Sequence, residues 1–168
     1  IRQEVDDSLR RLGTDVIDLY QVHWPDPAVA PEETAEAMYG LLESGKVRAI
    51  GVSNFSPEQM DAFRREAPLH TDQPPYNLFE RAIEADVVPY CRDRGIGLIT
   101  YGALCRGLLN GKLGPDAAFP GEDLRNADPK FAQPCFGQYL EAVSRLDAVA
   151  QRRGVGVLEL AVCWLLDQ

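Results

Sequence analysis

The chain alternates short apolar runs with longer segments in which apolar residues recur every three or four positions. A short apolar run rich in β-branched residues is typical of a buried strand, whereas the longer spacing is typical of a helix with one buried face. Apolar runs occur within residues 14–24, 47–52, 69–73 and 97–101. We therefore predict four strands, of which the third is the weakest because it has few apolar residues.

Helices are predicted between these strands and after the last one. Gly13 and Gly95 follow apolar stripes, and glycine readily takes the left-handed conformation that ends a helix. Ser56, followed by a proline and then by Gln59, predicts a helix that begins with a capping box. Glycine and proline between residues 102 and 134 indicate a long loop, and loops of this length are usually functional or disordered. The stripes consist of Val5, Leu9 and Leu12; Met38, Leu41 and Leu42; Met60 and Phe63; Ile83, Val87, Tyr90 and Cys91; Tyr139, Leu140, Val143, Leu146 and Val149; and Val157, Leu160, Ala161, Trp164 and Leu165.

Alternating strands and helices predict an α/β fold with right-handed crossovers and a parallel sheet. Two architectures remain open, a doubly wound sheet and a (β/α)8 barrel, and the barrel typically needs about 250 residues. The chain has 168 residues, begins with Ile1 and stops inside a helical pattern. We therefore favour a partial TIM barrel of about four β/α units plus a terminal helix, with residues 1–168 forming a single domain of a larger barrel.

Composition narrows the function classes. The net charge is -9, and the basic residues are scattered, so the chain is not predicted to bind nucleic acid. No apolar run approaches the roughly 18 residues that a membrane helix requires. The four cysteines lack the spacing of a metal site, and we expect reduced thiols in a soluble, cytoplasmic protein.

Polar or aromatic residues follow each predicted strand. In a parallel barrel the ligand site lies at the carboxyl ends of the strands, so these residues are the candidates for chemistry. Each has an ordinary structural alternative as a rim, turn, loop or core residue. A purely structural role, however, does not require polar or aromatic residues at the ends of all four strands. They are His23 and Trp24, Ser53 and Asn54, Gln73, and Tyr101.

Four segments of the chain read SLRRLGTDVIDLYQVHWPD, LLESGKVRAIGVSNFS, DQPPYN and TYGALCRGLLNGK. In this order and at these distances, they closely resemble the aldo-keto reductase family. The resemblance runs from Ser8 to about Lys112 and continues more loosely through the last two helical patterns. It implies a nicotinamide-dependent oxidoreductase on a (β/α)8 barrel, which reduces aldehydes or ketones to alcohols with NADP, or with NAD, as cofactor.

The resemblance also assigns roles to the residues at the strand ends. His23 corresponds to the catalytic histidine that donates a hydrogen bond to the substrate oxygen, a task that suits a neutral imidazole, and Trp24 lines the substrate pocket. Ser53, Asn54 and Gln73 match the residues that hold the nicotinamide carboxamide.

Tyr101 matches the aromatic residue that stacks on the nicotinamide ring. Small residues in the stretch that follows let backbone N–H groups approach the pyrophosphate. Lys112 and Arg125 resemble cofactor-contacting cations, although both also suit a solvated surface, and His70 matches no functional position. The residues of the pyrophosphate stretch are Gly102, Leu104, Arg106 and Gly107.

The family's catalytic Tyr, Lys and Asp have no counterpart in these 168 residues. Tyr20 and Tyr39 do not substitute, because one is predicted inside a strand and the other inside a helix. We therefore expect the chain alone to be an inactive fragment of a reductase. Two alternatives remain open, a non-catalytic cofactor-binding regulatory subunit resembling potassium-channel beta subunits, and an inactive half barrel. The carbonyl substrate, the choice between NADP and NAD and the oligomeric state are not determined by the sequence.

Overall fold

A computed structural model describes residues 1–168 and contains a four-stranded, all-parallel sheet in the order β1-β2-β3-β4. The strands are β1 (Ile17–Val22), β2 (Val47–Ser53), β3 (Thr71–Gln73) and β4 (Gly97–Leu98). Each strand pairs with the next in the sequence, so Tyr20 lies opposite Ile50 and Val52 lies opposite Asp72. The predicted parallel α/β arrangement is confirmed.

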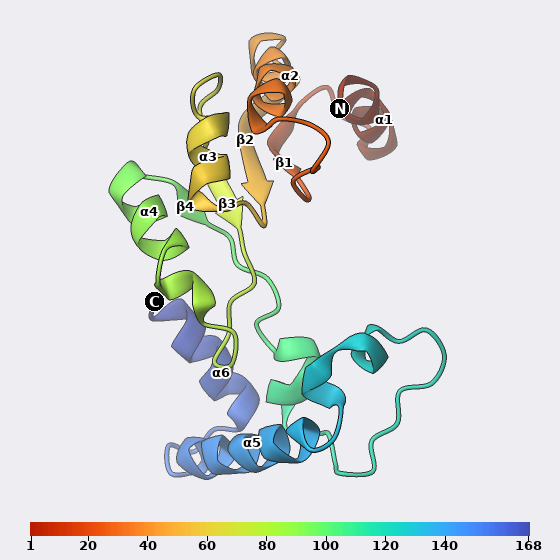
Figure 1. Cartoon of the computed structure of the whole chain (residues 1–168), viewed down its shortest axis with the longest axis vertical. Coiled ribbons are helices and arrows are strands. Elements are labelled where there is room, and N and C mark those ends of the chain that lie inside the picture. The colour runs from red at the N-terminus through yellow and green to blue at the C-terminus, as the bar shows by residue number, and fades with distance from the viewer. The chain divides into compact units, whose positions relative to one another are not determined.

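The chain divides into two compact units. The first comprises residues 1–75 and 82–101 and contains the sheet. Its helices are α1 (Arg2–Leu12), α2 (Pro31–Glu43), α3 (Pro57–Phe63), the 3-10 turn η1 (Ala82–Glu84) and α4 (Val87–Arg94). In this unit α2 and α3 lie beside each other and α2 packs on β2 (Figure 1).

Several helix ends follow the local chemistry of the sequence. Gly13 and Gly95, at the ends of α1 and α4, have φ near 67°. The Ser56 hydroxyl accepts the Gln59 N–H while the Gln59 side chain accepts the Ser56 N–H, which confirms the predicted capping box.

The core of the first unit is apolar and lies between helices and sheet. Met38 from α2, Ile50 from β2, and Met60 and Phe63 from α3 are completely buried. Val5 of α1 is buried as predicted, but Leu12 from the same stripe is 67% exposed because it lies in the last turn of the helix.

The second unit comprises residues 76–81 and 102–168. It contains the 3-10 segments η2 (Cys105–Asn110), η3 (Leu124–Ala127) and η4 (Pro129–Phe131), and the helices α5 (Cys135–Gln151) and α6 (Val157–Leu166). α5 and α6 pack against each other (Figure 1). Its core includes Leu108, Leu109, Phe136, Val143 and Val157.

Some predicted boundaries were wrong. The strand expected over residues 97–101 has only two residues of regular pairing, and Tyr101 then forms a single bridge with Pro75. Ile83 belongs to η1 rather than to the helix that begins at Val87. Neighbouring Pro and Gly residues shorten the strand pairing in this region because proline lacks the N–H that a ladder requires.

All four cysteines are free, and no group of side chains has the arrangement of a metal site. No helix combines the length and the apolar character needed to cross a membrane.

Candidate functional site

Asn54 is the centre of a hydrogen-bonded group at the carboxyl ends of β1 and β2. Its Nδ2 donates to the Ser53 Oγ (2.9 Å) and to the backbone oxygen of His23 (3.2 Å). Its Oδ1 accepts from the Tyr101 hydroxyl (2.9 Å). Asn54 has φ 63°, a left-handed conformation that asparagine adopts more readily than most residues. This turn directly after β2 lets one side chain join segments far apart in sequence.

Ser53 links this group to β3. Its buried hydroxyl donates to the backbone oxygen of Gln73 (2.7 Å) while accepting from Asn54. The donor of Ser53 is therefore used within the protein. In this arrangement Ser53 positions Asn54 and Gln73.

Gln21 is a member of the site that sequence reasoning missed. Its Nε2 lies 3.2 Å from the Val52 oxygen and 3.3 Å from the Thr71 Oγ1, and its Oε1 accepts from the Gln73 Nε2 at 3.4 Å. Gln21 precedes His23 by two residues, and alternate residues of a strand face the same side. The two-residue spacing from His23 is the signal in the sequence that could have identified Gln21.

Gly51 lies on β2, between β1 and β3, and has no side chain to separate Gln21 from Thr71. A Cβ at position 51 would lie 2.1 Å from the Thr71 Oγ1 and 3.1 Å from the Gln21 Cγ. Glycine therefore leaves the space in which Gln21 and Thr71 meet.

Exposed aromatic groups border the polar cluster. His23 and Trp24 follow β1 with their rings tilted and 6.5 Å apart, and Trp24 is 59% exposed. Tyr101 is 39% exposed, and its backbone N–H donates to the Pro74 oxygen (3.1 Å). The site thus combines primary amides, a histidine and accessible rings, which suits a planar ligand carrying an amide or a carbonyl group.

The structure brings together the five residues on which the predicted nicotinamide site depends. Hydrogen bonds connect Asn54 with Ser53, Tyr101 and the His23 backbone, and Ser53 with the Gln73 backbone. His70 lies apart from this group, and its Nδ1 is 3.1 Å from the Ile50 backbone nitrogen.

The predicted pyrophosphate residues lie in the second unit, on a tightly turned segment. Positive φ values occur at Gly102 (74°), Cys105 (47°), Arg106 (51°) and Gly107 (95°). The Cys105 N–H donates to the Gly102 oxygen (2.8 Å), and the Gly107 N–H donates to the oxygen of Leu104 (2.9 Å). Burial raises the pKa of the Cys105 thiol to about 12, so this cysteine is a neutral core group.

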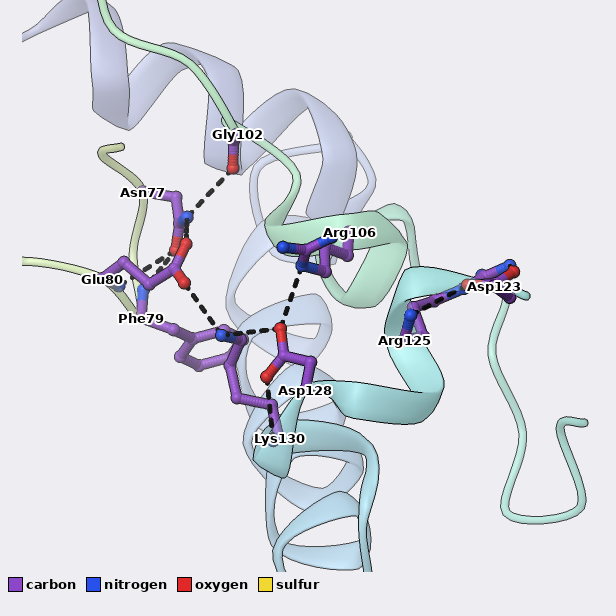
Figure 2. A network of polar contacts seen from close by, with 9 residues as sticks. All are labelled: Asn77, Phe79, Glu80, Gly102, Arg106, Asp123, Arg125, Asp128 and Lys130. Atoms are coloured by element: carbon purple, nitrogen blue, oxygen red, sulfur yellow. Dashed lines mark hydrogen bonds and ion pairs between the residues drawn. The ribbon is translucent and has the colours of Figure 1, made fainter. Parts of the chain in front are cut away.

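An ionic network surrounds this segment (Figure 2). The Lys130 Nζ lies 2.8 Å from the Glu80 Oε1 and 3.0 Å from the Asp128 Oδ2, and the Arg106 Nε lies 3.0 Å from the same Asp128 oxygen. Buried Asn77 donates to Glu80 and to the Gly102 backbone oxygen (2.9 Å). Sequence reasoning missed Asn77, Glu80, Asp128 and Lys130, although Asn77 belongs to the DQPPYN segment.

The two remaining predicted cations have different surroundings. Lys112 is exposed and borders a cavity of about 550 Å³ that Asp147 and Glu159 also line. Arg125 donates through Nε and Nη2 to both oxygens of Asp123 (2.9 and 2.6 Å) and lies 4.1 Å from the centre of the Phe119 ring. The Arg125 hydrogen bonds lower the pKa of Asp123 to about 2, so this pair is ionised at neutral pH.

Asp72 is an unexpected feature of the first unit. Its side chain is completely buried, and neither carboxyl oxygen has a hydrogen-bond partner. Burial raises its pKa to about 6, although the nearby backbone N–H groups of Gln73 and Phe55 partly oppose that rise. Burial, followed by the charge of Asp72, raises the pKa of the Cys91 thiol to about 11.

Comparisons with known proteins identify the family of the chain. The sequence model of the Aldo/keto reductase family matches residues 1–168. The chain is 62% identical over 169 residues to aldo-keto reductase YhdN of Bacillus subtilis (strain 168), covering 100% of this chain and 51% of that protein.

Two solved structures are similar to the chain. The glycerol dehydrogenase AKR11B4 from Gluconobacter oxydans has a TM-score of 0.94 and 54% identity, with 99% of this chain and 51% of that chain covered. An aldo/keto reductase from Klebsiella pneumoniae, in complex with NADP and acetate, has a TM-score of 0.72 and 30% identity, with 97% and 49% covered.

The chain thus spans about half the length of the relatives it matches. The chain has four parallel strands and covers about half of an aldo-keto reductase structure. It is therefore a partial TIM barrel, as predicted. The match over all 168 residues places the chain in the aldo/keto reductase family.

Proposed function

We propose that the protein containing this chain reduces aldehydes or ketones to alcohols with a nicotinamide cofactor, NADP or alternatively NAD, in the cytoplasm. The observation that carries the proposal is the connected group of His23, Ser53, Asn54, Gln73 and Tyr101 at the strand ends. A small-molecule carbonyl compound is the proposed substrate, since the family match supports this class.

The donor set fits a nicotinamide carboxamide. A primary amide offers two donors and an acceptor. Gln73 keeps its oxygen and the second of its Nε2 hydrogens, since the first goes to Gln21. The two Nδ2 hydrogens of Asn54 bind Ser53 and His23, so Asn54 contributes its oxygen as an acceptor. Ser53 uses its donor inside the protein, so its proposed role is to hold Asn54 and Gln73 in position. The exposed ring of Tyr101, tied to Asn54 through its hydroxyl, provides a face for stacking.

When bound, the cofactor supplies the hydride. His23 is the proposed catalytic residue of this chain, because an imidazole N–H can donate to the substrate oxygen as negative charge develops there. Removing one such preorganised donor typically costs about 3–4 kcal/mol of transition-state stabilisation. Trp24 is the proposed wall of the substrate pocket, consistent with its exposure next to His23.

The phosphate-contacting residues of the proposal lie in the second unit. The turn from Gly102 to Gly107 is the proposed phosphate-binding segment, and Arg106 and Lys112 supply positive charge. The N–H groups of Cys105 and Gly107 bond within the turn and stabilise its shape. Arg125 is the least available of these cations, because its guanidinium already binds Asp123 through two hydrogen bonds.

The proposal is tested by titrating the protein, together with any sequence that accompanies this chain naturally, with NADPH and NADH while following fluorescence. Turnover of 4-nitrobenzaldehyde is measured in parallel. Gln73→Leu replaces the amide by an apolar side chain of similar size and is expected to weaken cofactor binding. Gln168→Leu, the same change at an exposed position after α6, serves as the matched control.

Cofactor binding with turnover supports the reductase, while binding without turnover on any of a panel of aldehydes and ketones favours the regulatory alternative. Absence of binding to either nucleotide overturns both. A polypeptide of residues 1–168 alone is expected to show no NADPH oxidation above background, because the family's catalytic Tyr, Lys and Asp have no counterpart in it.

A further inference from the structure

The backbone around Arg106 is strained and needs support from its surroundings. Cys105 and Arg106 both have φ near 50°, a conformation that costs a non-glycine residue on the order of 1–3 kcal/mol. Local backbone hydrogen bonds from Cys105 and Gly107 offset part of that cost. The Arg106 side chain has a further contact, the 3.0 Å pair between its Nε and the Asp128 Oδ2.

The two partners of that pair differ in exposure. The Asp128 side chain is 8% exposed, whereas the Arg106 side chain is 47% exposed. Asp128 therefore anchors the inner edge of the guanidinium while much of the arginine reaches solvent. Arginine carries five N–H donors in a fixed fork, and Asp128 contacts the Nε.

Asp128 is itself fixed by its neighbours. Its Oδ1 accepts the Lys130 N–H (3.0 Å), and its Oδ2 contacts the Lys130 ammonium (3.0 Å). Burial alone would raise the pKa of Asp128, but Lys130 and Arg106 hold it below its usual value. Burial alone would lower the pKa of Lys130, but Glu80 and Asp128 raise it, so the pair remains ionised at neutral pH.

The network continues to the start of the same turn. Lys130 binds Glu80, Glu80 accepts from Asn77, and Asn77 donates to the Gly102 backbone oxygen (Figure 2). One connected set of polar groups thus holds both the beginning of the turn and Arg106. A single ion pair on the surface contributes little to stability. A partly buried network with mutual hydrogen bonds, by contrast, can hold its side chains in one geometry.

We propose that Asp128 is a positioning residue that orients Arg106 toward the diphosphate of a nicotinamide cofactor, with Lys130 and Glu80 holding Asp128 in place. This inference rests on the proposed function. A guanidinium whose Nε is anchored presents its terminal nitrogens in a defined direction, which favours two-point contact with phosphate oxygens. Asp128 acts through Arg106 and does not touch the cofactor itself.

A double-mutant cycle on cofactor affinity tests this role. Asp128→Asn keeps the size and the acceptor for the Lys130 N–H but removes the charged contact with Arg106. Removing a negative charge would by itself strengthen binding of an anion, so weaker binding of the cofactor is not a simple effect of charge. We expect the NADPH Kd to rise about tenfold for Asp128→Asn and for Arg106→Ala, as for loss of one charge-assisted hydrogen bond.

The decisive comparison is Asp128→Asn in the Arg106→Ala background, where less than a twofold further change is expected because the residue through which Asp128 acts is gone. Glu141→Gln is the matched control, since it removes the same charge from an exposed ion pair with Arg145 on α5. Its Kd is expected to stay within twofold. Tm is measured for every variant, and Asp128→Ser, whose hydroxyl can also accept the Lys130 N–H, replaces Asp128→Asn if the latter does not fold.

An unchanged Kd for Asp128→Asn overturns the inference, as does an equal loss in both backgrounds, which identifies a purely structural role. With either of these results for the variants, the proposed function still stands as long as the unmodified protein binds NADPH or NADH. If it binds neither nucleotide, the proposed function fails and the inference fails with it.

Discussion

Replacing Asp72 by valine is expected to stabilise the protein, and more so at neutral than at acidic pH. The Asp72 carboxyl is 0% exposed and makes no hydrogen bond. It lies on β3 in register with Val52 and Leu98. Valine is close to aspartate in size and favours strands, so it can occupy this position without burying a charge.

The size of the effect follows from the pKa of Asp72. The folded pKa of about 6 exceeds the ordinary value of 3.8, so ionising this group in the folded protein costs about 3 kcal/mol. Below pH 3.8 both states are protonated and this cost is absent. Between pH 3.8 and 6 the unfolded chain ionises first, so the free energy of unfolding falls as the pH rises. Above pH 6 the full cost persists.

The assay is urea unfolding at pH 7.5 and pH 4.0. Asp72→Val is expected to be more stable than the unmodified protein at pH 7.5, with a gain about 2 to 3 kcal/mol larger than at pH 4.0. Asp72→Asn removes the titration but keeps a polar side chain, so its gain at pH 7.5 is expected to be smaller, about 1 kcal/mol, after the cost of an unpaired amide. The exposed Asp116→Asn is the control for any general effect of charge.

Equal effects of Asp72→Val at the two pH values would refute this reasoning. So would a destabilised valine variant at pH 7.5, because it would show that the carboxylate has a favourable partner in solution. A change in the urea m-value would indicate an altered unfolded state and would require thermal unfolding as a second measure.

Two further substitutions test the geometry of the site. Gly51→Ala is expected to destabilise the protein by about 1–3 kcal/mol in urea unfolding, because the new Cβ would lie 2.1 Å from the Thr71 Oγ1; stability equal to that of the unmodified protein would show that the strands separate easily. Tyr101→Phe keeps the ring but removes the 2.9 Å hydrogen bond to Asn54, so NADPH should bind several-fold more weakly in a fluorescence titration, by up to about tenfold. An unchanged Kd would mean that the ring alone determines the contribution of this residue.

Local chemistry made much of the fold predictable. A helix end needs only a few neighbouring residues, so Gly13, Gly95 and the Ser56 capping box were identified correctly. β1 and β2 were equally clear because their apolar runs are long enough to distinguish them from loops. β4 was overestimated, since residues 97–101 are apolar enough for a strand but only two of them pair regularly.

The candidate site was predictable for a different reason. In a parallel sheet all carboxyl ends share one edge, so polar residues that follow successive strands converge even when they are far apart in the sequence. This topological argument predicts that Asn54, Ser53 and Tyr101 lie together, and hydrogen bonds join them in the structure. The family resemblance then supplied the proposed roles, which the geometry by itself does not distinguish.

The sequence by itself determined the order and kind of the elements and the residues at the strand ends, because these depend on neighbours along the chain. Only the tertiary structure decided that Asp72 lacks a partner and that Glu80, Lys130, Asp128 and Arg106 form one network. Desolvation and ion pairing depend on which side chains surround a group in space. Those neighbours come from segments up to about 50 residues away, and no local pattern of residues encodes the distances between them.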